Sequence, residues 1–303
     1  MKVFIDGQAG TTGLKLQEKL LALKDTEILQ LQSHLYKNDE AKKEIMQKAN
    51  VIFLCLPDEA AKSSALLAPS DTLVIDASTA HRTNPNWVYG FPELSENYEK
   101  KVRNAKRISV PGCHATGFIS IVYPLISCGL LNKSSHLTCT SLTGYSGGGK
   151  ALIQKYEQNR TKDDMLHAPM PYALNLNHKH LKEMKYITGL DNEPHFYPVV
   201  GNMYSGMLVS VHIFKNQLKQ STQIQDIHCA LKNNYNNSKY VSVMDLNYNT
   251  SDGFLDPTVL NGTNNLQIFV YGHNEQITVI ARLDNLGKGA SGAALQCMQL
   301  TTK

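Results

Sequence analysis

The chain has 303 residues, 42 % of them hydrophobic and 18 % charged, with a formal net charge of +4 at pH 7. These values are typical of a globular protein with a hydrophobic core, and the length suits one large or two medium domains. No long block of Lys and Arg occurs, so we expect no nucleic-acid partner, whereas the mild positive charge suits a small anionic ligand.

Short apolar strands alternate with helix-like stretches up to residue 110. The expected strands are Lys2–Asp6, Glu27–Leu31, Val51–Cys55 and Leu73–Asp76, and the expected helices are Thr11–Leu23, Asp39–Lys48 and Asp58–Leu67. This alternation with short links predicts a parallel sheet that is built from right-handed crossovers.

The pattern changes after Cys113. A helix is expected over Ala115–Ser127, and strands over His136–Leu142, Met207–Phe214 and Gln276–Leu283 predict an antiparallel or mixed sheet. A last helix is expected over Ala290–Leu300.

The six cysteines form no CxxC pair, which favours free thiols in a reducing cytoplasm. No apolar run approaches the roughly 20 residues of a membrane helix, and the start MKVFIDG has no signal-peptide core. We therefore expect a cytoplasmic protein without a membrane segment, and we predict no metal site.

A glycine-rich loop directly follows the first strand. It has the pattern GxxGxxG, and its residues are Gly7, Gln8, Ala9, Gly10, Thr11, Thr12 and Gly13. Glycines let the backbone approach a pyrophosphate, and the N-terminus of the next helix supplies N–H donors. We interpret the loop as a dinucleotide site; the alternative is a turn that only permits tight strand–helix packing.

The segment after the second strand predicts which dinucleotide binds. NAD sites usually place an acid there for the ribose 2′-hydroxyl, but the first acid in this chain is Asp39. Ser33, His34 and Lys37 are instead suited to a 2′-phosphate, which favours NADP. The alternative is that they are ordinary loop residues.

Cys113 follows Pro-Gly at the expected start of a helix, where the helix dipole favours a thiolate. A thiol nucleophile needs a base. Its neighbour His114 is a poor partner because successive helix residues point about 100° apart. His180 and Glu183 share a helix face, so we favour His180 as the acid/base and keep His178 as a close second. A solvated His-Lys-His surface turn is the alternative.

A second glycine-rich stretch, Gly144–Ala151 (GYSGGGKA), resembles a Walker A loop but has Ala151 where that loop needs Ser or Thr for magnesium. Ser146, Gly147 and Gly148 are therefore interpreted as a substrate loop rather than an ATP site. A structural bend before the expected helix Ala151–Asn159 is the alternative.

Eight ordered segments together resemble the N-acetyl-γ-glutamyl-phosphate reductase family in its shorter form. They are IDGQAGTTG, LCLPDEAA, DASTAHR, YGFPEL, VPGCHATG, GYSGGGK, HKHLKE and DNLGKGASGAA. The resemblance implies an α/β fold, with an N-terminal Rossmann domain (a doubly wound parallel sheet) and an α+β mixed-sheet catalytic and dimerisation domain. It also implies domain boundaries at 1–112 plus 284–303 and at 113–283.

The same resemblance implies NADPH-dependent reductive dephosphorylation of N-acetyl-L-glutamyl 5-phosphate through a Cys113 thioester. It places the turn Gly287, Lys288 and Gly289 at the cofactor. Ser78 and Arg82 are interpreted as contacts to the cofactor and to the substrate phosphate, respectively; the alternative is that either is a structural hydrogen-bonding residue. Tyr172 is placed at the substrate, where it and Glu183 flank the two histidines and are suited to orient them. The resemblance further implies a homodimer or homotetramer.

Three other functions are compatible with parts of the sequence. A lysine-pathway relative acts on an aminoadipyl phosphate one methylene longer, which is worth only about 1–3 kcal/mol in a pocket. A non-catalytic NADPH-sensing regulator has no need for Cys113 beside a His/Glu pair. A P-loop phosphotransferase is disfavoured by Ala151.

Overall fold

The computed structural model describes residues 1–158, 165–250 and 252–302. The chain divides into two compact units. The first comprises Met1–Pro92, Glu96–Gly112 and Ala290–Lys303, and the second comprises Glu93–Ser95 and Cys113–Gly289. Residues 284–289, which the sequence analysis grouped with the first domain, thus fall in the second unit. The ends of two predicted segments, Asn159 and Lys303, lie outside the described residues.

The first unit contains a six-stranded sheet with all paired strands parallel. The strand order is β2-β1-β3-β4-β6-β5, so the winding reverses beside β1, as in a doubly wound fold. The strands are β1 Lys2–Asp6, β2 Glu27–Leu29, β3 Val51–Leu54, β4 Leu73–Asp76, β5 Val88–Tyr89 and β6 Arg107–Ser109.

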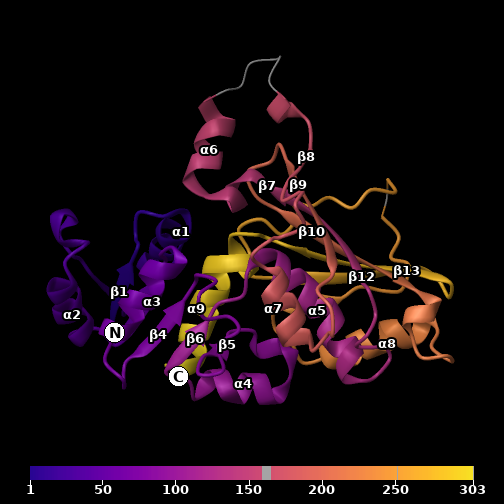
Figure 1. Cartoon of the computed structure of the whole chain (residues 1–303), viewed down its shortest axis with the longest axis horizontal. Coiled ribbons are helices and arrows are strands. Elements are labelled where there is room, and N and C mark those ends of the chain that lie inside the picture. Colours follow the sequence, from indigo (N-terminus) through magenta and orange to yellow (C-terminus); the bar gives the residue numbers. More distant parts are fainter. Residues whose placement is uncertain (159–164, 251, 303) are drawn as a thin grey trace. The chain divides into compact units, whose positions relative to one another are not determined.

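Helices cover both faces of this sheet (Figure 1). They are α1 Thr11–Leu21, α2 Asp39–Gln47, α3 Asp58–Leu67, α4 Glu96–Arg103 and α9 Gly292–Thr301. Alternate strand residues serve the two cores, as the pleat requires. Val3 and Ile5 pack with α1 and α9 residues such as Leu16 and Met298. Phe4 faces the other way and packs with Met46 of α2.

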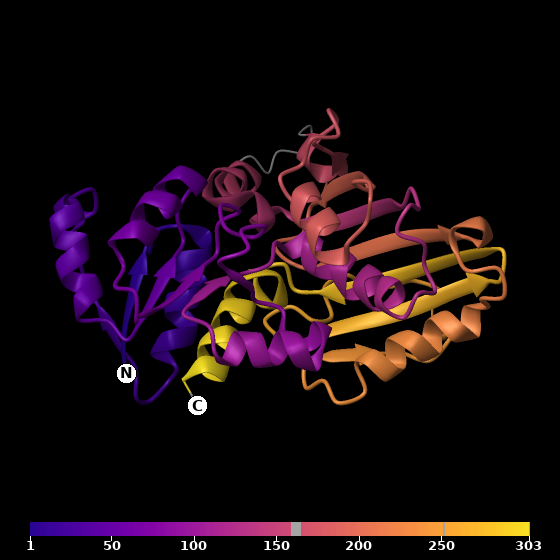
Figure 2. The same cartoon turned by 60° about the horizontal axis from the view of Figure 1, so that its bottom comes forward.

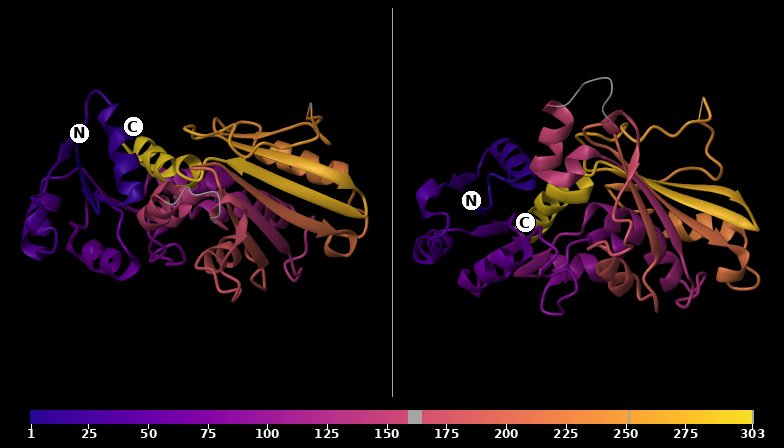
Figure 3. Two further views of the ribbon diagram at one scale, coloured as in Figure 1. Left: turned by 90° about the horizontal axis from the view of Figure 1, so that it is seen from above. Right: turned by 45° about the horizontal axis from the view of Figure 1, so that its top comes forward.

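The second unit contains a mixed seven-stranded sheet in the order β11-β12-β13-β10-β7-β9-β8. Its strands are β7 Thr138–Gly144, β8 Met170–Pro171, β9 His195–Gly201, β10 Met207–Phe214, β11 Val241–Val243, β12 Leu266–His273 and β13 Gln276–Leu283. The long antiparallel hairpin of β12 and β13 is drawn in yellow in Figure 3. The parallel and mixed sheets confirm the predicted fold class.

Helices α5 (Cys113–Ser127) and α8 (Ile224–Asn234) pack on the central sheet of the second unit (Figure 2). Helix α7 (Leu181–Thr188) packs against α5, and α6 (Gly149–Gln158) follows the glycine-rich loop after β7. Nearly all of α5 is buried, which explains why its sequence is apolar on every side rather than on one stripe.

Several predicted bounds were wrong by a few residues. Strand β2 ends at Leu29 because only three of its residues pair with β1. The strand predicted over His136–Leu142 is shifted to β7, whose pairing with β9 extends to Gly144. The helix predicted from Ala115 already begins at Cys113.

Candidate active site

The glycine-rich loop after β1 is shaped by close backbone contacts. Gly7 has φ +88°, and a Cβ there would lie 2.3 Å from the Cys55 carbonyl oxygen. A Cβ at Gly13 would lie 2.5 Å from the Gly7 carbonyl oxygen. No side chain fits at either position, so both glycines are required by the turn itself.

The loop lies at the carboxyl edge of the first sheet, between β1 and α1. Strands β2 and β3 flank β1 in the sheet, and this reversal point is where dinucleotides bind in doubly wound folds. Gly10 caps α1 without a side-chain hydrogen bond, and the first turn holds no acid. Ala9 is exposed, and Thr11 and Thr12 are half-buried. The loop and its helix N-terminus therefore fit a pyrophosphate.

Ser33 and His34 begin a short 3-10 turn after β2, and both are exposed. Since β2 pairs parallel with β1, this turn lies at the same sheet edge as the glycine-rich loop. The first acid beyond it, Asp39, begins α2. The placement is compatible with a 2′-phosphate contact, which stays a prediction.

The side chains of Ser78 and Arg82 form hydrogen bonds to other residues of the first unit. The Ser78 hydroxyl donates to Asp76 Oδ2 at 2.7 Å. The Arg82 guanidinium donates to the backbone carbonyls of Val110 at 2.8 Å and Ala77 at 3.1 Å. Both side chains are buried, and the contacts described here hold the loop after β4. Their predicted cofactor and substrate contacts stay predictions.

Cys113 is the first residue of α5 and is half-buried. The helix approaches the sheet closely, since a Cβ at Gly117 would lie 2.5 Å from Val209 of β10. On its other side Cys113 meets the chain after β13, where a Cβ at Gly289 would lie 2.7 Å from Cys113 Cβ. The thiol therefore sits at a helix N-terminus whose position is set by the sheet below it.

Three imidazoles gather behind this helix start. His114 lies with its ring centroid 5.3 Å from that of His178 and 5.5 Å from that of His180. Its Nδ1 is 2.8 Å from Ser141 Oγ, and its Nε2 is 2.8 Å from the Tyr172 hydroxyl. Ser141 is a residue of β7. Three segments distant in sequence, at residues 114, 141 and 172–180, thus form one polar cluster.

Burial keeps His114 neutral. Desolvation lowers its pKa to about 3, and the nearby His178 and Lys179 add repulsion against a further positive charge. Burial also raises the pKa of Tyr172, and the negative charge of Cys113 adds to this rise. Tyr172 therefore stays protonated and lies within electrostatic range of the thiolate.

His180 precedes α7 as its N-cap residue, and Glu183 lies in the first turn. His180 Nε2 is 4.0 Å from Glu183 Oε1, and both side chains are buried. His178 is half-buried, and its Nδ1 accepts the His180 backbone N–H at 3.2 Å. The predicted His180/Glu183 pair is thus brought together, with His178 beside it.

Hydrogen bonds from Asn285 hold the loop Gly144–Lys150 in the second unit. Asn285 donates through Nδ2 to Ser146 Oγ at 2.9 Å and accepts the Gly206 N–H through Oδ1 at 2.9 Å. A Cβ at Gly147 would lie 3.5 Å from Asn285 Nδ2, whereas one at Gly148 would collide with Leu152 at 2.4 Å. Ser146 is buried, so its hydroxyl braces the loop.

Lys288 is also engaged within the second unit. Its ammonium is 2.6 Å from Glu93 Oε1, with only 1 % of the residue exposed. A Cβ at Gly287 would lie 2.0 Å from the Thr263 carbonyl oxygen, so the turn needs glycine there. These contacts tie residues 287–289 to the unit that carries Cys113. Their predicted role at the cofactor stays a prediction.

Three residues of the site could not be assigned from the sequence. His114 was rejected as a base, Ser141 lay in no motif, and Asn285 lay in DNLGKGASGAA but was given no role. Ser141 lies 27 positions from His114, and Asn285 lies 139 positions from Ser146. No spacing rule connects such pairs, because the contacts arise only when the sheet of the second unit forms.

The other cysteines are less suited to nucleophilic chemistry. Burial, with added repulsion from Asp76 and Asp6, raises the pKa of the Cys55 thiol to about 12. Burial also raises the pKa of Cys139, and Cys297 is buried. Cys128 and Cys229 are exposed but lie outside the histidine cluster.

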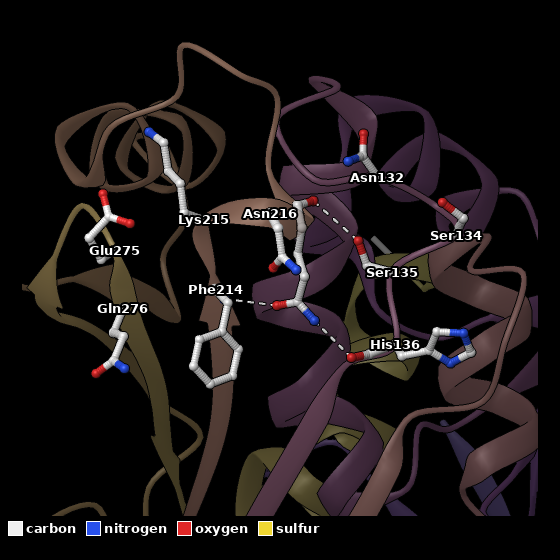
Figure 4. A pocket seen from close by; sticks show the side chains of 10 residues that line it. Asn132, Ser134, Ser135, His136, Phe214, Lys215, Asn216, Glu275 and Gln276 are labelled. Atoms are coloured by element: carbon white, nitrogen blue, oxygen red, sulfur yellow. Dashed lines mark hydrogen bonds between the residues drawn. The ribbon is translucent and has the colours of Figure 1, made fainter.

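A separate cavity of about 700 Å³ lies in the second unit, with its lining shown in Figure 4. Phe214 at the end of β10 and Gln276 at the start of β13 line it. Residues 287–289, which meet Cys113, follow the opposite end of β13, about 24 Å away at the usual rise per strand residue. The cavity is therefore remote from the thiol.

Within residues 1–158, 165–250 and 252–302, no three His, Cys, Asp or Glu side chains are arranged to hold a metal ion. The same residues include no helix with both the length and the apolar character that crossing a membrane requires.

Residues 3–102 match the semialdehyde dehydrogenase NAD-binding domain, and residues 113–285 match the semialdehyde dehydrogenase dimerisation domain. An N-acetyl-γ-glutamyl-phosphate reductase of Nostoc sp. is 41 % identical, over 99 % of this chain and 96 % of that protein. The chain belongs to the N-acetyl-γ-glutamyl-phosphate reductase family of semialdehyde dehydrogenases. The resemblance inferred from eight motifs is thereby confirmed, as is the prediction of an enzyme with a nicotinamide-nucleotide domain.

Other members of the reductase family include that of Sinorhizobium medicae, 36 % identical over 99 % of this chain and 98 % of that protein. Among solved structures, aspartate semialdehyde dehydrogenase from Francisella tularensis superposes with a TM-score of 0.75 at 14 % identity, over 100 % of both chains. The enzyme from Candida albicans, solved with NADP, gives 0.68 at 14 % identity, over 99 % of this chain and 98 % of that one. These two structures share the fold.

Proposed function

We propose that this chain catalyses the NADPH-dependent reductive dephosphorylation of N-acetyl-L-glutamyl 5-phosphate to N-acetyl-L-glutamate 5-semialdehyde, a step of arginine biosynthesis. The observation that carries the proposal is Cys113, half-buried at a helix N-terminus and next in the chain to His114, whose ring lies 5.3 Å from that of His178 and 5.5 Å from that of His180. The reductase names of relatives at 36–41 % identity supply the substrate class.

Cys113 is the proposed nucleophile. Its thiolate attacks the acyl carbon of the acyl phosphate, and phosphate leaves with the electron pair of the broken C–O bond. The product of this half-reaction is a thioester on Cys113. The N-terminus of α5 stabilises the thiolate before attack and again when the C–S bond later breaks.

Bound NADPH supplies the hydride that reduces the thioester carbonyl carbon. The glycine-rich loop and the N-terminus of α1 are proposed to hold the pyrophosphate through Gly7, Gly10 and Thr11. Ser33 and His34, exposed at the same sheet edge, are proposed to bind the 2′-phosphate. The missing acid at the end of β2 supports NADP over NAD.

His180 is the proposed acid/base. It gives a proton to the oxyanion formed on reduction, which yields a thiohemiacetal, and it then accepts the hydroxyl proton as the C–S bond breaks. Glu183 Oε1, 4.0 Å from His180 Nε2, supports the protonated imidazole. His178 is the other candidate, because it lies beside His180 and is more exposed.

The loop Ser146–Gly148 is the proposed substrate contact. Asn285 holds Ser146, so the backbone amides of the loop are kept in a fixed position. Lys150 is exposed at the start of α6, and its charge suits an anionic substrate. Assembly as a homodimer or homotetramer is also proposed, supported by the match to a dimerisation domain.

A substrate panel tests the function. The purified protein is assayed for phosphate-dependent reduction of NADP or NAD with N-acetylglutamate semialdehyde and with its aminoadipate homologue. We expect the glutamate semialdehyde with NADP to give the largest kcat/KM. Preference for the longer homologue would assign the chain to the lysine-type reaction instead, and activity without phosphate would contradict the acyl-phosphate mechanism.

A further inference from the structure

The turn that follows β13 contacts the proposed nucleophile directly. A Cβ at Gly289 would lie 2.7 Å from Cys113 Cβ and 3.1 Å from Cys113 Cα. Both distances are well below the 3.5–4.0 Å of an ordinary contact between carbon atoms. The backbone of Gly289 therefore packs against Cys113, and the position of this turn limits the space that is left for the Cys113 side chain.

Asp284 fixes the base of the turn. Its carboxylate accepts the backbone N–H of Leu286 at 2.9 Å and that of Gly262 at 2.8 Å. Its backbone carbonyl accepts the N–H of Gly289 at 3.1 Å. These bonds set where the turn leaves β13, but they do not involve the side chain of Lys288, which is the residue before Gly289.

The side chain of Lys288 points into the second unit. Its ammonium lies 2.6 Å from Glu93 Oε1 and 5.6 Å from the centroid of the Tyr240 ring. Both charged side chains are almost fully buried. To bind a phosphate, this ammonium would have to leave Glu93, which would then be a buried carboxylate that has lost its counter-charge. Such a separation is costly, so the ion pair holds Lys288 in place.

Glu93 lies in a segment that is itself anchored to the helices of the second unit. The next residue, Leu94, is fully buried, and its backbone carbonyl accepts a hydrogen bond from Asn234 Nδ2 at 3.5 Å. Asn234 is the last residue of α8, which packs against α5, the helix that begins with Cys113. The carboxylate that holds Lys288 is thus fixed relative to the helix that carries the thiol.

We propose that the Lys288–Glu93 ion pair holds Gly289 against Cys113 and thereby positions the nucleophile, so that Lys288 acts on the thiol through this contact and not as a ligand of the nucleotide. Lys288 and Glu93 are positioning residues, because they act through the backbone of Gly289. This role replaces the cofactor contact that the motif resemblance implies for Lys288. The inference rests on the proposed role of Cys113 as the nucleophile.

The first test measures how open the surroundings of Cys113 are, without substrate or nucleotide. Alkylation rates are compared for iodoacetamide and the bulkier N-ethylmaleimide, and chymotryptic mapping separates Cys113 from the exposed Cys128 and Cys229. Lys288→Met keeps the apolar stem and removes the charge. We expect the ratio of the N-ethylmaleimide rate to the iodoacetamide rate at Cys113 to rise at least about threefold, and the ratios at the exposed cysteines to stay unchanged. An unchanged ratio at Cys113 would overturn the proposal.

Lys239→Met is the matched control. The ammonium of Lys239 lies 5.3 Å from the centroid of the same Tyr240 ring, but this lysine is exposed. The variant removes a positive charge beside the ring and leaves the Lys288–Glu93 pair intact, so we expect the native ratio at Cys113. Equal rises in Lys239→Met and Lys288→Met would show that charge at the ring matters and not the ion pair.

The double variant tests whether Lys288 and Glu93 act as one unit. Glu93→Gln should also raise the ratio at Cys113, and Lys288→Met combined with Glu93→Gln should raise it no further than the larger single effect, because both changes remove the same interaction. Additive rises would contradict the proposal. If Lys288→Met does not fold because Glu93 has lost its counter-charge, the double variant, in which neither charge remains, gives the deciding measurement.

Nucleotide titration and kinetics separate positioning from cofactor binding. In Lys288→Met and in Glu93→Gln we expect kcat to fall at least about tenfold, because a small displacement of a reacting atom is costly. NADP affinity, measured by fluorescence titration, should change less than about threefold in both variants. A loss of NADP affinity confined to Lys288→Met would assign the lysine to the nucleotide and overturn the proposal. Because alkylation needs neither nucleotide nor acyl phosphate, failure of the substrate panel and failure of this proposal are distinguishable.

Discussion

The two units present their candidate functional groups in different ways. In the first, the glycine-rich loop offers backbone N–H groups at the start of α1, and side chains are excluded by contacts as short as 2.3 Å. In the second, the cluster is made of side chains from α5, β7 and the segment before α7, and the glycine turn after β13 packs against Cys113. A backbone site depends on a local conformation, whereas a side-chain site depends on the whole unit being folded.

This difference predicts which substitutions impair nucleotide binding and which impair the reaction at Cys113. A change in the loop Gly7–Gly13 should weaken nucleotide binding and leave the thiol reactive. A change in the Cys113 cluster should abolish chemistry and leave nucleotide binding intact. The following predictions test that separation, from the largest expected effect to the smallest.

Cys113→Ser should lower kcat at least about 10³-fold, because the hydroxyl is a far weaker nucleophile than the thiolate. Steady-state assays with N-acetylglutamate semialdehyde, phosphate and NADP give the loss. NADP affinity, measured by fluorescence titration, should change less than about threefold. Cys128→Ser is the control, since that thiol is exposed and outside the cluster; unchanged turnover in Cys113→Ser would end the covalent mechanism.

His180→Asn should lower kcat by about 10²-fold or more, the usual contribution of an acid/base. His178→Asn is the matched control, because its imidazole lies 4.6 Å from that of His180, centroid to centroid. We expect the smaller loss there. The reverse order would assign the acid/base role to His178 and reduce Glu183 to a buried structural carboxylate.

Gly7→Ala should lower the free energy of unfolding by about 3 kcal/mol and weaken NADP binding, because the new methyl group collides with the Cys55 carbonyl. Gly189→Ala is the control, with φ +73° and ψ +22° in the left-handed helical region and no atom within 4 Å of its Cβ. Only the backbone conformation is penalised there, at about 1 kcal/mol. Denaturant titrations measure both, and equal losses would show that crowding at Gly7 is unimportant.

His114 should make stability fall in acid. Its pKa is about 3 in the folded protein against a usual 6.5, so the unfolded chain binds a proton that the folded chain refuses. The stabilising contribution is complete above pH 6.5 and is lost as the pH falls towards 3, at most about 1.4 kcal/mol per pH unit. His114→Gln should show a shallower slope in urea titrations over this range; a slope unchanged from the native protein would contradict the buried neutral imidazole.

The first unit was largely predictable from the sequence. Its glycine-rich loop, β4 and α3 have the expected bounds because buried parallel strands are short apolar runs, and because α3 begins with the two acids Asp58 and Glu59 directly after Pro57. The predicted strand Glu27–Leu31 is two residues longer than β2, because Leu31 continues the apolar pattern after pairing with β1 has ended at Leu29.

The second unit was predictable only in part. Strands β10 and β13 followed from local patterns, and helix α5 was predicted with its start two residues late. The contact between His114 and Ser141 could not be predicted. The rule that successive helix residues point in different directions does not say which distant segment packs against each of them. Ser78, Arg82 and Lys288 illustrate the converse: motif positions whose side chains are bound within their own unit.

The seating of α5 on β10 has a consequence for changing the specificity of the enzyme. Gly117 has only a hydrogen atom between α5 and Val209. Any larger residue at this position would push α5 away from the sheet and displace the Cys113 sulfur. Changes that adapt the enzyme to a longer or shorter acyl chain must therefore keep Gly117 and alter the surrounding loops instead. The residues that carry the reaction and the residues that select the substrate can then vary independently.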